Sequence, residues 1–444
     1  MFLYRRYNSF GMKDLHDTII IGAGAAGLMA AYSACRSCID SGKKPDVLIL
    51  EGKDVAGKKI TATGNGKCNF TNSFQDEGCY RSNDTAKAFR IVSRFDHYAV
   101  LDMFSSIGIM PRERNGYYYP YGEQAKTVRD VLKNRVESLG TKILTEKRVC
   151  EIKTDKRTKK DNTIIKNVYE DIYVITCTDN TKYCAHKLII CAGGSAAPVF
   201  GTDGSMYSLL KNIGLKLVSP RPALCGLKID YKNLRLIDGV RLKCNCSLFT
   251  GEKKNIIYSE AGEIIFSKNG ISGIPVMNLS RFAIDEMAKH NKCGLILDMF
   301  PDTGESELAD YMLSVVNGCI GQIGTALSAV INDKFLKVIF RDTGLEYDTE
   351  IESCSENALR NGLKKLEALL KGFTLYITGD AGFENAQTTQ GGVDLSEINE
   401  ETMECKKFPG MYLAGEVLDV DGMCGGYNLQ WAWSTGFISG RSCS

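Results

Sequence analysis

Three glycines and one acid near the start of the chain have the spacing of a phosphate-binding turn. Gly22, Gly24 and Gly27 follow the apolar run of residues 17–21 and precede a helix-like run. In such a turn the first glycine permits a sharp bend, the second admits a pyrophosphate to the helix N-terminus, and the third allows close helix–strand packing. A second apolar run ends at Glu51, whose carboxylate can accept hydrogen bonds from ribose hydroxyls. The pattern predicts a βαβ unit that binds a dinucleotide.

Two further glycine-rich turns follow apolar runs that read as buried strands. The sequence AGG at 192–194 ends one of them, and Gly415-Glu416 ends the other. Ligands of open α/β sheets bind beyond the carboxyl ends of the strands. We therefore expect the three turns to meet at one extended ligand.

The C-terminal turn favours FAD over NAD alone as that ligand. Gly425-Gly426-Tyr427-Asn428 precedes a helix, predicted over 428–439, that returns the chain to its first domain. The N-terminus of such a helix offers unpaired N–H groups and the positive end of a dipole, which would stabilise a reduced flavin at its N1/O2 edge. No second G-x-G-x-x-G nucleotide domain follows, so any NAD(P)H must dock directly over the flavin.

The sequence offers no clear candidate residues for a metal site or for a catalytic nucleophile. The four histidines are scattered, and Cys244 and Cys246 have no neighbouring His or Cys cluster that would complete a zinc site. A disulfide reductase needs a redox dithiol beside its flavin, whereas Cys68 stands alone in its loop. We expect no metal, and no residue is assigned as catalytic or as the proton donor.

Composition excludes several other classes. The net charge of +2 over 444 residues gives no electrostatic footprint for nucleic acid, and no apolar stretch is long enough to span a membrane. Residues 1–16 read as a disordered leader without the apolar core of a secretory signal. The 17 cysteines are spread along a long chain, unlike a secreted disulfide framework, and indicate a reducing cytoplasm.

The pattern of elements predicts an α/β protein with a discontinuous first domain. Helices are expected at 85–94, 97–107 and 124–139, and short alternating strands from 223 to 267 indicate an antiparallel sheet or barrel. We predict a Rossmann-like FAD-binding domain at 17–198 and 384–444, an inserted β-barrel domain at 199–274 and 371–383, and a helical subdomain at 275–370.

Several motifs carry a family resemblance over nearly the whole chain. They include GAGAAGLMAA from Gly22, TGNGKCNFTN from Thr63, CAGGSAAPVFGTDGSMY from Cys191, TTQGGVDLSEI from Thr388 and LAGEVLDVDGMCGGYNLQWAW from Leu413. The chain resembles the BaiN-like flavoproteins, also described as NAD(P)/FAD-dependent or aminoacetone-oxidase-family oxidoreductases. The resemblance implies a Rossmann-like FAD domain with an inserted β-barrel and a small helical domain.

The turns and the resemblance together predict a set of residues that contact non-covalent FAD. They are Gly22, Gly24, Ala25, Ala26, Gly27, Glu51, Gly52, Lys59, Thr63, Gly64, Lys67, Cys68, Asn69, Val149, Ala192, Gly193, Gly194, Gly415, Glu416, Asp419, Gly426, Tyr427, Asn428, Leu429 and Gln430. Two positions depart from the usual family pattern. Lys67 stands where an arginine is typical, which removes a bidentate phosphate contact but keeps the charge. Tyr119-Pro120 replaces the usual Phe-Pro.

The expected activity is that of an FAD-dependent oxidoreductase. Hydride from NAD(P)H would pass through flavin N5 to a conjugated C=C bond of a hydrophobic, steroid- or bile-acid-like enone, in a site between the flavin and the inserted domain. Tyr117, Tyr119 and Ser272 are the candidates for the walls of that site. An amine or aminoketone oxidase that uses O₂ remains an alternative. From other classes, so do an RNA-binding flavoprotein that modifies tRNA and a flavin sensor without turnover.

Overall fold

The computed structural model describes residues 15–160, 167–304 and 306–444. The chain folds into two compact units, each of which has most of its contacts within itself. The first comprises the described residues up to Arg221 together with Thr388–Ser444, and the second is Pro222–Gln387. Residues 199–221 thus lie in the first unit. The finer division of the insertion into a barrel and a helical subdomain stays a prediction.

The first unit is built on a seven-stranded sheet in the order β7-β2-β1-β10-β9-β8, with β19 also paired to β10. Its strands are β1 (Leu15–Ile21), β2 (Val47–Leu50), β7 (Lys142–Leu144), β8 (Val149–Lys160), β9 (Asn167–Cys177), β10 (Lys182–Ile190) and β19 (Met411–Leu413). Strands β7, β2, β1, β10 and β19 run parallel, whereas β9 pairs antiparallel with β10 and β8. Residues of β1 and β2 are buried on both faces, as parallel strands covered by helices must be. Most of the predicted leader lies outside the described residues, but Leu15 and His16 already belong to β1.

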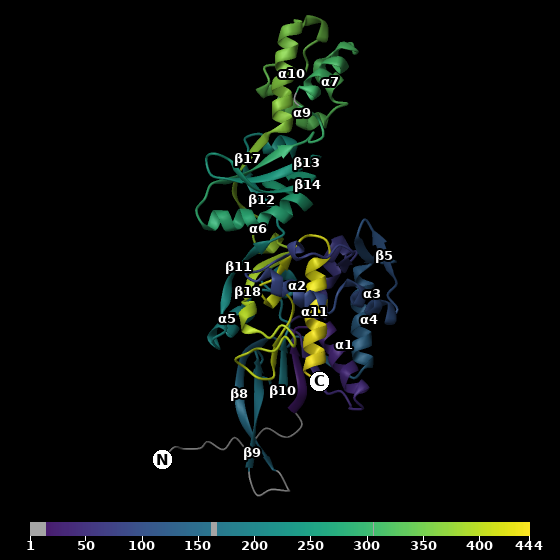
Figure 1. The fold of residues 1–444 in the computed structure, drawn as a ribbon, viewed down its shortest axis with the longest axis vertical. Coiled ribbons are helices and arrows are strands. Elements are labelled where there is room, and N and C mark those ends of the chain that lie inside the picture. Colours follow the sequence, from purple (N-terminus) through teal and green to yellow (C-terminus); the bar gives the residue numbers. More distant parts are fainter. Residues whose placement is uncertain (1–14, 161–166, 305) are drawn as a thin grey trace. The chain divides into compact units, whose positions relative to one another are not determined.

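Helices α1 (Ala25–Asp40) and α11 (Tyr427–Ser442) pack against each other side by side (Figure 1). Glycines on α11 make this close approach possible. A Cβ on Gly436 would lie 2.4 Å from the carbonyl oxygen of Ala26, and one on Gly440 would lie 2.1 Å from that of Ala30. The two glycines are four residues apart and so share one face of the helix. The C-terminal helix is therefore joined to the first βαβ unit along its length.

Shorter elements complete the first unit. The helices are α2 (Thr85–Ser93), α3 (His97–Ser106), α4 (Ala125–Ser138) and α5 (Ser205–Asn212). Three small sheets pair β3 (Thr71–Asn72) with β6 (Tyr117–Pro120) and β5 (Pro111–Arg114), β4 (Tyr80–Arg81) with β20 (Asp421–Gly422), and β11 (Leu217–Ala223) with β18 (Thr388–Val393). The predicted helices at 85–94, 97–107 and 124–139 are confirmed to within a residue or so at each end.

The second unit contains a closed six-stranded barrel in the order β12-β15-β14-β13-β16-β17. The strands are β12 (Leu227–Asp230), β13 (Arg241–Thr250), β14 (Asn255–Ser267), β15 (Gly270–Gly273), β16 (Cys293–Asp298) and β17 (Phe373–Asp380). Helices α6 (Ile274–Ala288), α7 (Glu307–Asn317), α8 (Ile323–Leu327), α9 (Asp333–Ile339) and α10 (Glu356–Lys371) accompany it. Barrel and helices share one apolar core. The predicted fold class, a Rossmann-like domain with an inserted barrel and helices, is confirmed.

Candidate cofactor and active site

The first glycine turn has the geometry of an anion site. Gly22 has a φ of +97°, and a Cβ there would lie 2.5 Å from the carbonyl oxygen of Cys191, so only glycine fits. A Cβ on Gly27 would lie 1.9 Å from the carbonyl oxygen of Gly22, which explains the third glycine of the motif. By contrast, a Cβ on Gly24 would meet nothing within 4 Å. Helix α1 begins at this open position without a side-chain cap and without an acid in its first turn. Its N-terminal N–H groups and dipole are left for an anionic ligand.

Glu51 joins this turn to the end of β2. Its Oε2 accepts a hydrogen bond from the backbone N–H of Ala23 at 2.7 Å, and its Oε1 accepts one from Lys53 at 2.8 Å. Burial raises the pKa of the carboxyl above its ordinary value, and these backbone hydrogen bonds oppose the rise. A carboxylate oxygen has a second lone-pair direction. Glu51 therefore holds the loop in place and still has acceptor capacity for a ligand hydroxyl.

The loop after β2 contains Thr63, Gly64, Lys67 and Cys68, four of the predicted contacts. Gly64 has a φ of +56°, and a Cβ there would lie 2.8 Å from the backbone nitrogen of Asn69. Lys67 forms an ion pair with Glu123 at 2.9 Å. Cys68 is fully buried, and burial raises the pKa of its thiol to about 12. This thiol stays protonated near neutral pH and serves as a small core side chain.

Asn69 provides a test of whether the site fits a flavin nucleotide. The residue is 8% exposed, and its Oδ1 is buried with no hydrogen-bond partner among the described residues. A buried polar atom without a partner carries a free-energy cost of about 1–3 kcal/mol unless a ligand supplies one. A Cβ on Gly426 would lie 2.9 Å from this oxygen, which places it beside the start of α11. A ligand N–H, such as a flavin ring offers, would satisfy Asn69 there.

Gly426 itself is required by the protein backbone. It has a φ of +96°, caps α11 without a side-chain hydrogen bond, and would place a Cβ 2.8 Å from the carbonyl group of Thr71. A side chain at this position collides with β3 whether or not a flavin is bound. The helix N-terminus remains uncapped and free of acids in its first turn, as at α1. Two uncapped helix N-termini therefore belong to the predicted cofactor set.

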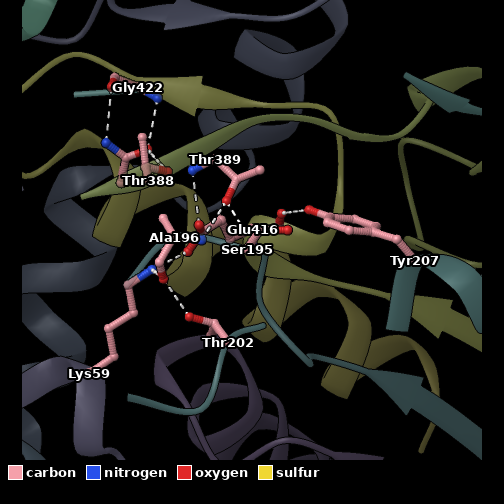
Figure 2. A network of polar contacts seen from close by, with 10 residues as sticks. Lys59, Ser195, Ala196, Thr202, Tyr207, Thr388, Thr389, Glu416 and Gly422 are labelled. Carbon is pink, nitrogen blue, oxygen red and sulfur yellow. Dashed lines mark hydrogen bonds and ion pairs between the residues drawn. The ribbon is translucent and has the colours of Figure 1, made fainter. Parts of the chain in front are cut away.

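A polar network unites the second and third glycine turns (Figure 2). The Nζ of Lys59 donates to Glu416 Oε2 at 2.8 Å, and Glu416 Oε1 accepts from the backbone N–H of Thr389 at 3.0 Å. The Oγ1 of Thr389 accepts from the backbone N–H groups of Ser195 at 2.8 Å and of Ala196 at 3.0 Å. A Cβ on Gly194 would lie 2.4 Å from that same Oγ1. The turn after β10 is thereby fixed to β18 and to the turn after β19.

Several other predicted residues have side chains that are engaged within the protein. Asn428 bonds the Gly422 peptide through both amide atoms, at 2.8 and 2.9 Å. Gln430 is fully buried and bonds Thr71 at 2.5 Å and Phe95 at 3.0 Å. Asp419 is buried and accepts from the Asn83 N–H, Tyr427 packs on Tyr80, and Val149 belongs to the core. Contacts from the backbone of these residues to FAD stay a prediction.

Two of the three predicted substrate residues lie near this site. Strand β6 pairs with β3, which places the ring of Tyr119 next to Gly64 and the ring of Tyr117 next to Gly425. Ser272 lies on β15 in the second unit, and its role stays a prediction. Sequence reasoning did not assign Thr389, although its TTQGG motif was part of the resemblance. It also missed Asn72, whose Nδ2 donates to the Gly425 carbonyl at 3.0 Å.

Comparisons with known proteins identify the family. A model described as the HI0933-like protein Rossmann domain matches residues 16–442. The chain belongs to this family. It is 33% identical to the 3-dehydro-bile acid delta(4,6)-reductase of Clostridium scindens over 96% of this chain and 98% of that protein. The predicted resemblance is confirmed, and the predicted class, a flavin-dependent oxidoreductase, is supported.

Other relatives widen the range of chemistry in the family. The ribosomal RNA dihydrouridine synthases of Haemophilus influenzae and Escherichia coli are 26% and 27% identical over 98% and 94% of this chain, and over 100% and 96% of those proteins. A solved 3-ketosteroid delta1-dehydrogenase from Sterolibacterium denitrificans shares the fold, with a TM-score of 0.50 and 11% identity over 97% of this chain and 99% of that one. Since two relatives are named for work on RNA, the absence of a nucleic-acid partner stays a prediction.

The sequence predicts neither a metal site nor a membrane-spanning helix. No cluster of three or more potential metal ligands occurs among them. None of the described helices is both long and apolar enough to cross a membrane. The cytoplasmic location stays a prediction.

Proposed function

We propose that this protein is an FAD-dependent reductase of carbon–carbon double bonds conjugated to a carbonyl group, with NAD(P)H as the hydride source. The observation that carries the proposal is a set of strand-end turns at two uncapped helix N-termini, in a chain one-third identical to an enone-type reductase. The relatives' names share one chemistry. A 3-dehydro-bile acid with a Δ4 double bond and the uracil ring of uridine each contain a C=C bond conjugated to a carbonyl.

Different residues of this chain would bind different parts of the cofactor. The open N-terminus of α1 at Gly24 would hold the pyrophosphate, and Glu51 would accept hydrogen bonds from the adenosine ribose. Asn69 and the N-terminus of α11 would face the polar edge of the ring. Bound FAD would supply hydride transfer at N5. The protein's own contribution is to orient the ring and to supply fixed dipoles at its edge.

A hydrophobic enone is the preferred substrate class. The rings of Tyr117 and Tyr119 lie beside the two loops predicted to hold the flavin, and Tyr118 between them faces the core. Aromatic rings at such a position offer flat apolar surface to a steroid-like skeleton.

The direct experiment measures the two half-reactions separately. Protein should be purified with its cofactor, the released cofactor identified as FAD, and the flavin reduced anaerobically with NADH or NADPH. Mixing the reduced protein with testosterone or cyclohexenone should restore the oxidised flavin spectrum and saturate the C=C bond. Rapid reoxidation by air, with no response to enones, would instead identify an oxidase. A protein that carries no FAD and takes none up would refute the proposal.

A second candidate is the reduction of uridine in ribosomal RNA. The relatives from H. influenzae and E. coli favour it, because their matches extend over almost the whole chain. The same reduced protein should be mixed with an unmodified ribosomal RNA transcript, and the nucleosides analysed for uridine that has gained two hydrogens. Turnover of RNA but not of enones would select this candidate over the first.

A further inference from the structure

The tyrosines of strand β6 divide between two faces. Side chains of a strand alternate, so Tyr117 and Tyr119 share one face and Tyr118 takes the other. Tyr118 packs against the apolar core of the first unit. The ring of Tyr119 lies 3.6 Å from the position of a Cβ on Gly64, and the ring of Tyr117 lies 3.0 Å from that on Gly425. The face of Tyr117 and Tyr119 thus adjoins both loops of the proposed flavin site.

The hydroxyls of two buried tyrosines of this unit are bound within the protein, whereas among the described residues that of Tyr119 is not. Tyr80 donates to Gln75 at 2.7 Å, and Tyr207 donates to the carbonyl oxygen of Glu416 at 3.1 Å. The half-buried Tyr119 has no hydrogen-bond partner for its hydroxyl within the described part of the chain. Buried tyrosine hydroxyls usually find a partner. This one is available to a molecule bound against the two loops.

We propose that in this protein Tyr119, which stands where the family usually has phenylalanine, donates the proton that completes reduction of the double bond, an inference that rests on the proposed function. Hydride with its electron pair joins the β-carbon of the enone, and the electron pair of the C=C bond moves toward the α-carbon and carbonyl. The phenolic O–H bond of Tyr119 breaks, and a C–H bond forms at the α-carbon. Water then returns a proton to the tyrosinate, so one NAD(P)H and one proton are consumed for each bond reduced.

The surroundings keep the Tyr119 hydroxyl protonated until it is needed. Burial raises its pKa above the ordinary value, and the neighbouring Tyr117, Cys424 and Glu123 raise it further. Arg114 opposes this rise, but it is also paired with Glu123 at 2.8 Å. A neutral phenol in this position can act as a general acid across the neutral range.

Cys424 is the competing proton donor. It lies in the turn before α11, it is one of the groups that influence Tyr119, and burial raises the pKa of its thiol to about 11. Both groups would be protonated at neutral pH, so their protonation states do not show which of them donates the proton. Replacing each residue in turn does.

The test compares Tyr119→Phe, Cys424→Ala and a matched control, Tyr118→Phe, which removes a hydroxyl from the opposite face of the same strand. All three should bind FAD like the wild type, and NAD(P)H should reduce their flavin at the wild-type rate. Reoxidation by testosterone should slow by about 100-fold or more in Tyr119→Phe, the lower end of general-acid contributions. It should stay within about 3-fold of the wild type in the other two.

The position of deuterium in the reduced product distinguishes proton donation by Tyr119 from a purely structural role, which would leave it unchanged. In D₂O the wild type should deliver deuterium to one face of the α-carbon, and Tyr119→Phe should lose that selectivity. Added phenol should partly restore its reoxidation rate. Wild-type selectivity and rate in Tyr119→Phe, or a loss confined to Cys424→Ala, would overturn the inference while leaving the proposed function intact. Failure of the wild type itself to reduce enones would overturn both.

Discussion

Replacement of Glu51 by glutamine separates its two proposed roles. The carboxylate holds the N–H groups of Ala23 and Lys53 at 2.7 and 2.8 Å, one on each oxygen. Glutamine keeps a single acceptor oxygen, so one of these N–H groups will face an NH₂ donor. A hydrogen bond to a charged group contributes about 1.5–3 kcal/mol. We expect the apoprotein to lose about that much unfolding free energy.

The same substitution should weaken FAD binding by a separate amount. If the ribose hydroxyls bond to the remaining lone pairs of Glu51, loss of the charge removes a further 1.5–3 kcal/mol, roughly a 10- to 150-fold rise in Kd. Urea unfolding of the apoprotein measures the first loss, and titration of the apoprotein with FAD, followed by flavin fluorescence, measures the second. Stability in the presence of FAD should fall by the sum, because ligand binding adds to the unfolding free energy.

Glu397→Gln is the matched control. Glu397 is a buried glutamate of the first unit, and its carboxylate accepts from the backbone N–H of Lys216 at 3.1 Å and from Lys407 Nζ at 2.9 Å. It is not among the predicted cofactor residues. This variant should lose stability and keep the wild-type Kd for FAD. An unchanged Kd in Glu51→Gln, together with reduced stability, would show that Glu51 only holds the loop and that the adenosine lies elsewhere.

Three further predictions follow from packing and charge. Gly436→Ala should lower the free energy of unfolding by about 1–3 kcal/mol, because the added Cβ forces α11 away from α1. Urea unfolding should show no comparable loss in the control Gly122→Ala, where a Cβ meets nothing within 4 Å. Despite burial, which alone would raise it, hydrogen bonds from Lys216 and Ser396 lower the pKa of Asp394 to about 2. The stability that this carboxylate contributes is therefore present above its unfolded pKa of about 4 and is lost as pH falls toward 2. The difference in unfolding free energy between wild type and Asp394→Asn should shrink over that interval. Iodoacetamide should label the exposed Cys150 long before the buried Cys68 in the native protein, and mass spectrometry showing equal rates would contradict the assignment of Cys68 to the core.

The sequence predicted the elements whose signals are local. The GAGAAG turn, its flanking strand and helix, and the helices α2, α3 and α4 follow from spacing within a short window, because periodicity and glycine placement are properties of neighbouring residues. The bounds of α2, α3 and α4 agree with the structure to within a residue or so, whereas β1 begins two residues before its predicted start. The family motifs, in addition, predicted the inserted barrel.

Contacts between distant segments were decided by the tertiary structure. Nothing near Asn69 in the sequence indicates that its amide oxygen is left without a partner beside Gly426, or that Thr389 holds the turn after β10. Nor does the sequence show that Gly426 avoids the Thr71 carbonyl, a contact that makes glycine necessary for the fold itself. These features depend on how α11, β3 and β18 pack after hundreds of intervening residues. Packing of remote elements leaves no periodic signal in the chain, so only the folded structure distinguishes a glycine that serves a ligand from one that serves the backbone.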